Sequence, residues 1–148
     1  MNTKDLEKLI PESWDKLPDL DLYMDQVLSL IERTKLIEDG HTLTSSMVNN
    51  YAKQGLLPRA KGKRYTKEHL MLLTIISQLK QVYGVSELGQ ILGSMRTGDV
   101  SEGYEIYRGY LIEALEALEA ELGDPLRLAA FAFVFKIASE QLIEKSDD

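Results

Sequence analysis

Six basic side chains lie between Leu43 and Leu70, a stretch in which Glu68 is the only acidic residue. They are Lys53, Arg59, Lys61, Lys63, Arg64 and Lys67. The chain of 148 residues has 17 basic and 24 acidic side chains, so its remainder is acidic and repels polyanions. Lysine and arginine bind phosphate and carboxylate groups, so the cluster predicts a local contact with an anionic partner. A solvated charged loop is the alternative interpretation of the same residues.

Small polar residues overlap the start of this cluster at the spacing of one helix face. They recur at i, i+3, i+4 and i+7, as Ser46, Asn49, Asn50 and Lys53. The apolar positions between them fall on the opposite face: Met47, Val48, Tyr51 and Ala52. Hydroxyl and amide groups both donate and accept hydrogen bonds. The pattern predicts an amphipathic helix whose outward face either binds a polar partner or is an ordinary solvated surface.

Capping and turn signals set the limits of this helix. Thr44 is a good N-cap, and Gly55 can adopt positive φ after the last turn, so we expect a helix over about 44–54. The pair Lys61-Gly62 suits a tight hairpin turn, which predicts a small β-hairpin wing over 57–65. These elements would place the polar stripe beside the basic residues.

Hydrophobic periodicity predicts further helices around this region. An amphipathic helix is expected over 20–34 and a short one over 85–95. Thr66 can cap a helix that is apolar on more than one side, which should therefore be buried at the centre. Two longer helices follow, over 104–122 and from Pro125 to about residue 143, joined by a turn containing glycine.

No arrangement of residues suited to catalysis is evident. The absence of cysteine excludes disulfides, thiolate metal sites and cysteine nucleophiles. Glu113, Glu116 and Glu119 recur along one helix, but the two histidines, His41 and His69, are distant in sequence, so a solvated acidic face is favoured over a metal site. Neither a glycine-rich phosphate loop nor a Ser-His-Asp arrangement is suggested. We therefore predict no enzyme, no metal and no cofactor.

The composition also predicts where the protein resides. The N-terminal residues lack the basic, apolar and small-residue order of a signal peptide. The most apolar segment, 126–137, is interrupted by Arg127 and Lys136 and is shorter than the roughly 18 to 20 residues of a membrane span. We expect a soluble, cytoplasmic protein without a membrane partner.

The segment NYAKQGLLPRAKGKRYTKEHL resembles the second helix, wing and third helix of MerR-type winged-helix regulators. The matching residues are Tyr51, Lys53, Gly55, Leu56, Leu57, Pro58, Tyr65, Thr66 and Leu70. Through DLYMDQV and SMVNNYAKQGLLP, the chain also resembles an uncharacterised bacterial domain-of-unknown-function family with a MerR-like DNA-binding region. It departs from the MerR pattern at Asn49-Asn50, where Arg-Tyr is usual, and at Lys63, which stands nearest to the usual wing arginine.

The MerR resemblance implies a helix in the major groove of DNA and a wing on the flanking phosphate backbone. Asparagine can bind adenine N6 and N7 together, which makes Asn49 and Asn50 the expected base contacts. The expected phosphate contacts are Lys53, Arg59, Lys61, Lys63 and Arg64. Ser45, Ser46 and Lys67 complete the candidate DNA-binding site.

Together these features predict a mainly α protein in two parts. Residues 1–96 would form a MerR-like winged helix-turn-helix with an N-terminal helical extension, and residues 97–148 a helical hairpin for packing or dimerisation. The expected function is that of a sequence-specific DNA-binding transcriptional regulator, and the resemblance to MerR-type regulators implies a homodimer through the helix at 104–122. The alternative is a protein–protein interaction module on a winged-helix scaffold that binds an acidic partner.

A small-molecule effector is not predicted. The aromatic residues that could line an effector pocket are Tyr104, Tyr107, Tyr110, Phe131, Phe133 and Phe135. Packing in a core is the commoner use of such side chains.

Overall fold

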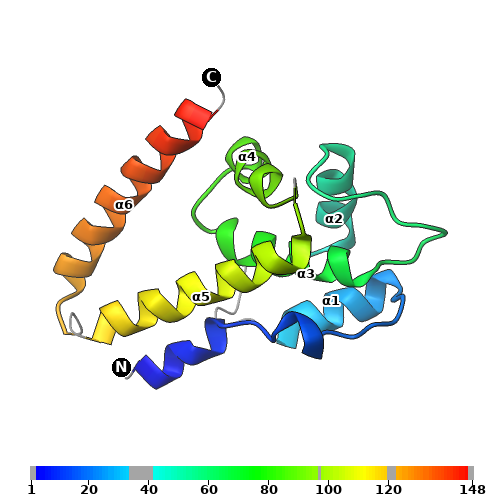
Figure 1. Cartoon of the computed structure of the whole chain (residues 1–148), viewed down its shortest axis with the longest axis horizontal. Coiled ribbons are helices and arrows are strands. Elements are labelled where there is room, and N and C mark those ends of the chain that lie inside the picture. The colour runs from blue at the N-terminus through cyan, green and yellow to red at the C-terminus, as the bar shows by residue number, and fades with distance from the viewer. Residues whose placement is uncertain (1–2, 34–41, 97, 120–122, 147–148) are drawn as a thin grey trace.

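The computed structural model describes residues 3–33, 42–96, 98–119 and 123–146, which are helical apart from turns, irregular segments and isolated β-bridges (Figure 1). Two 3-10 helices precede six α-helices in the described residues. Their bounds are η1 Thr3–Leu9, η2 Trp14–Lys16, α1 Met24–Arg33, α2 Ser45–Lys53, α3 Lys67–Leu79, α4 Val85–Arg96, α5 Val100–Glu119 and α6 Pro125–Ser146. None of these helices is long and apolar enough to cross a membrane.

The core is built around α3, whose side chains are apolar on several sides. Every residue from His69 to Ser77 is buried, and α1, α4 and α5 all pack against this helix. A helix that is hydrophobic nearly all round has to be enclosed by its neighbours. The prediction of a buried central helix is therefore confirmed.

The N-terminal segment that contains Glu12 and Trp14 is hydrogen-bonded to α5. The backbone N–H of Trp14 donates to Oε1 of Glu105 at 2.7 Å, and the hydroxyl of Tyr104 donates to the carbonyl of Glu12 at 2.5 Å. Tyr104 is fully buried, and burial raises its pKa to about 12. Because α5 contributes to the same core as α3, residues on both sides of position 97 pack together; the division into two parts there stays a prediction.

The last two helices, α5 and α6, run in diverging directions, as Figure 1 shows. The carboxylate of Asp124 accepts the N–H of Leu126 at 3.0 Å and thereby caps α6. From there α6 runs towards α4, and Lys136 Nζ lies 3.8 Å from Oε2 of Glu87. The two helices do not pack as a hairpin, and this part of the predicted fold is wrong.

The predicted winged helix-turn-helix is also wrong. Between α2 and α3 the described chain forms no strand, and its β-pairing is limited to the isolated bridges Lys61–Arg64 and Leu22–Tyr65. The reason lies at Thr66, whose backbone N–H would pair with Arg59 across the turn but donates to Nδ1 of His69 at 3.0 Å. Thr66 is the N-cap of α3 and does not continue a strand, so the pairing stops after Lys61–Arg64 and a β-hairpin wing does not form.

Candidate nucleic-acid interface

The ends of α2 are fixed by the residues that the sequence predicts. Oγ1 of Thr44 accepts the N–H of Met47 at 3.2 Å, which confirms the N-cap. Gly55 follows the helix with φ of +84°, and the N–H of Leu56 then donates to the carbonyl of Tyr51 at 2.9 Å. This is the Schellman arrangement, which satisfies carbonyls that the helix leaves unpaired. The helix is thereby a fixed support for its outward side chains.

The outward face of α2 carries the polar stripe. Val48 and Tyr51 are buried on the other face, and burial raises the pKa of Tyr51 above its usual 10.0. The exposed candidate residues on this helix are Ser45, Ser46, Asn49, Asn50 and Lys53. Oδ1 of Asn50 accepts a hydrogen bond of 3.2 Å from Nε2 of Gln54, whereas the side chain of Asn49 bonds to no described residue. Both amides are therefore open to a polar ligand.

The segment between α2 and α3, residues 54–66, projects from the body of the protein and contains a tight turn (Figure 1). We call it the projecting segment. Lys61 and Arg64 exchange two backbone hydrogen bonds, of 3.1 and 3.0 Å. The two residues between them, Gly62 and Lys63, have φ of +58° and +64°, as in a type I′ turn. The tight turn predicted at Lys61-Gly62 thus forms one residue further along the chain, without the strands of a wing.

His69 ties this segment to the core. The N–H of Thr66 donates to Nδ1 of His69 at 3.0 Å, so Nδ1 is an acceptor and the proton resides on Nε2. Nε2 then donates to the carbonyl of Pro58 at 2.8 Å. The same ring packs edge-on against Tyr65, with 5.3 Å between centroids. One buried side chain therefore fixes the start of α3 and both ends of the projecting segment.

The basic side chains of this segment are exposed and have no acidic partners among the described residues. They are Arg59, Lys61, Lys63 and Arg64. Arg59 also lines a shallow hollow of about 270 Å³ together with Asn49 and Lys53 of α2. The remaining walls of the hollow are Ala52, Ala60 and Tyr65. The structure thus brings part of the polar stripe and part of the basic cluster to one surface.

Lys67 differs from the other candidate residues. It begins α3, and its Nζ lies 4.8 Å from the centroid of the Trp14 ring, where it makes a cation–π contact with the N-terminal segment. Its side chain is only half-exposed. Lys67 does not line the hollow beside Asn49, so the structure separates it from the other candidate residues there.

One supporting residue has no signal in the sequence. Nη1 of Arg96, at the end of α4, donates to the carbonyls of Gly55 and Leu56 at 3.0 and 3.4 Å. Arg96 thereby braces the C-terminal end of α2 from a helix that lies 40 residues further along the chain. A lone arginine at a helix end predicts no such contact, because its partners are backbone atoms.

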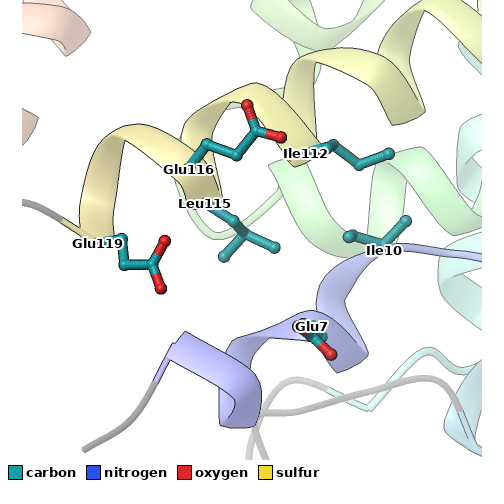
Figure 2. Close-up of a pocket in the computed structure, with 6 residues that line it drawn as sticks. All are labelled: Glu7, Ile10, Ile112, Leu115, Glu116 and Glu119. Atoms are coloured by element: carbon teal, nitrogen blue, oxygen red, sulfur yellow. The ribbon is translucent and has the colours of Figure 1, made fainter.

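Carboxylates gather at the opposite end of the molecule from α2. A hollow of about 420 Å³ lies between η1 and α5, and its lining residues are Glu7, Ile10, Ile112, Leu115, Glu116 and Glu119 (Figure 2). The part of the chain that the structure describes contains no group of three or more His, Asp or Glu side chains that could hold a metal ion; His41 lies outside it. Charge is therefore separated along the molecule, with free cations beside α2 and carboxylates beside η1.

Comparison with known proteins gives a family but no activity. Residues 12–110, about two thirds of the chain, match a family model described as Domain of unknown function (DUF1836). Neither a curated protein nor a solved structure matches the chain. The matched range includes α2, the projecting segment and α3, so the candidate surface lies within the shared region.

Proposed function

We propose that this chain, which belongs to the DUF1836 family, binds duplex DNA through the outward face of α2 and the adjoining basic turn, and acts as a sequence-specific transcriptional regulator. One observation carries the proposal. Asn49 shares a hollow with Lys53 and Arg59, so an amide that suits a base edge lies beside two cations that suit phosphate. No acidic side chain in the part of the chain that the structure describes pairs with these cations, which leaves them available to an external anion.

The dimensions of α2 suit the major groove. An α-helix with its side chains is about 10–12 Å wide, and the groove of B-DNA is about 12 Å wide. Asn49 and Asn50 face outward on this helix, and each can accept from and donate to adenine at N6 and N7. In this arrangement the side chains of the turn at Lys61 to Arg64 would lie along the neighbouring backbone.

The first turn of α2 adds a further phosphate contact. It contains no acidic residue, and Ser45 and Ser46 are exposed there. Unpaired N–H groups and the helix dipole favour an anion at such an end. The acidic remainder of the chain, with a net charge of −7, would keep binding to unrelated DNA weak.

Selection of bound sequences from a random duplex pool tests the proposal. The wild-type chain should enrich a motif, and the double variant N49A/N50A should lose the preference while it keeps weak, general binding. A good bidentate asparagine–adenine pair is worth roughly 1–3 kcal/mol of discrimination. Enrichment of no sequence by the wild type would contradict the proposal.

A set of charge variants separates positioning on the backbone from base contact. K61Q/K63Q/R64Q should weaken binding to every duplex by a similar factor, because phosphate contacts carry no sequence information. K8Q removes an exposed cation from η1, away from α2, and is the matched control that should bind as the wild type does. The interaction-module alternative would be favoured by two results together. The wild type would bind no duplex, and the triple variant would lose binding to an acidic protein partner.

A further inference from the structure

The outermost helix, α6, is oriented with its polar side chains towards the body. The hydroxyl of Ser139 hydrogen-bonds to that of Tyr83, and Lys136 Nζ lies 4.5 Å from the centroid of the Tyr83 ring and 3.8 Å from a carboxylate oxygen of Glu87. Lys136, Ser139 and Ile143 are half-buried on this side. Contacts made through lysine and serine leave most of the helix's apolar surface facing outward.

The outward side of α6 is apolar and uncovered in the single chain. Val134, which lies nearly opposite Lys136 on the helix, is 61% exposed. The other large apolar side chains exposed along α6 are Leu126, Phe131, Phe133, Phe135, Ile137 and Leu142. No side chain described in this helix is buried. Large apolar side chains grouped on one exposed helix face are typical of an interaction site.

The spacing of the outward residues fits a helical partner. The central stripe recurs at intervals of three and four residues: Arg127, Ala130, Phe131, Val134, Ile137, Ala138 and Gln141. This interval is the one that presents a continuous seam to a second helix. Apolar residues occupy the middle of the stripe and polar residues its two ends, so the expected occupant is an amphipathic helix with the same arrangement.

The stripe is complementary to itself when two copies run antiparallel. With a twofold axis at Val134, Ala130 faces Ala138 of the partner subunit and Phe131 faces Ile137 of the partner subunit. Small residues then oppose small ones and allow close approach, while large residues oppose large ones. A twofold interface requires this kind of self-complementary surface.

Charge favours the antiparallel direction over the parallel one. Arg127 would lie beside Gln141 of the partner subunit in an antiparallel pair, but beside a second arginine in a parallel pair. The net charge of −7 makes two copies repel each other over most of their surface. Between residues 128 and 139 the one charged side chain is Lys136, which faces the body of its own chain.

We infer that α6 pairs antiparallel with α6 of a second copy of this chain, about a twofold axis at Val134. This surface differs from the helix over 104–122, which the resemblance to MerR-type regulators implies as the dimerising element. The observed α5 is already packed against η1, η2, α3 and α4, whereas α6 is not enclosed. The inference does not depend on DNA binding.

Sedimentation equilibrium of the full chain tests the pairing. The wild type should have twice the mass of 16.8 kDa, and V134E should sediment as a monomer with unchanged helical circular dichroism. I106E is the matched control, because Ile106 is 48% exposed on α5 and lies outside the stripe; it should remain a dimer. A wild type that is monomeric at every concentration, or a V134E variant that stays dimeric, would overturn the inference.

Cross-linking tests the direction even if V134E fails to fold. The chain has no cysteine, so single cysteines can be introduced without background. A mixture of A130C and A138C chains should form a disulfide between the two variants, whereas A130C alone should not, since its two copies would be about 12 Å apart along the seam. A cross-link in A130C alone would indicate a parallel pair, and no cross-link in the mixture would exclude the antiparallel register; either result overturns the inference.

Discussion

The amphipathic helix α2 and the outer helix α6 turn opposite faces to the body of the protein. In α2 the apolar residues Val48 and Tyr51 are buried and the amides are outside. In α6 Lys136 and Ser139 face inward, and Val134 is outside. A solvated polar face needs no partner but offers hydrogen bonds to one, whereas an uncovered apolar face is stabilised only when something covers it. The two surfaces are therefore suited to different partners, a polar one at α2 and an apolar one at α6.

The largest contrast should appear when one leucine beside α2 and one leucine in α6 are each replaced by alanine. Leu56, which follows the C-terminal end of α2, is 4% exposed, and Leu142 of α6 is 68% exposed. L56A should lower the free energy of unfolding by about 2–5 kcal/mol, because it leaves a cavity. L142A in dilute, monomeric protein should change it by less than about 0.5 kcal/mol. Denaturant titration measures both values, and equal effects would show that α6 is enclosed by its own chain.

His69 should have the next largest effect, because it supports the projecting segment beside α2. H69A removes the bonds to Thr66 and to the carbonyl of Pro58, with an expected loss of about 1–3 kcal/mol in unfolding free energy. H69Q keeps an acceptor for the N–H of Thr66 and should lose less. If both variants unfolded as the wild type does, the segment would be held by other contacts.

Association through α6 should make stability depend on protein concentration. For a dimer that unfolds to two chains, each tenfold rise in concentration should add about 1.4 kcal/mol per dimer to the unfolding free energy. The V134E variant should lack this dependence. Thermal scans over a hundredfold range of protein concentration measure this dependence. If the unfolding midpoint of the wild type does not change with concentration, the chain does not associate through α6.

The smallest effect on stability should come from the polar stripe. N49A/N50A exchanges two exposed residues in a helix for the strongest helix former, so the unfolding free energy should stay constant or rise by up to about 1 kcal/mol. Denaturant titration beside a DNA-binding assay separates the two roles. A marked loss of stability would mean that the asparagines serve the fold and not a ligand.

Local signals in the sequence predicted α2 well. Thr44 caps it and Gly55 ends it at positive φ, because capping depends on residues within one turn of the helix end. The same kind of signal predicted the turn near Gly62. Whether strands flank such a turn depends on where the next backbone groups bond, and here His69 takes the N–H of Thr66, which would otherwise pair with Arg59 across the turn. The sequence therefore predicted a tight turn that forms one residue further along the chain, but it wrongly predicted the strands of a wing on either side of that turn.

The path of α6 was beyond prediction from periodicity. Its hydrophobic pattern indicated a helix in need of a partner, but not which side would face the chain. That choice depends on contacts with Tyr83 and Glu87, about fifty residues earlier. The candidate site shows the same limit, since Asn49 and Lys53 could be placed on one helix face while their position beside Arg59 required the structure.

The salt dependence of DNA binding tests the central claim most directly. If the turn and α2 neutralise about four phosphates per chain, a plot of log K against log salt should have a slope of roughly −3.6 per chain, or about −7 for a dimer. Fluorescence anisotropy on the selected duplex between 50 and 200 mM salt measures this slope, and K61Q/K63Q/R64Q should make it shallower. Binding that is independent of salt, or no binding to any duplex, would contradict the account.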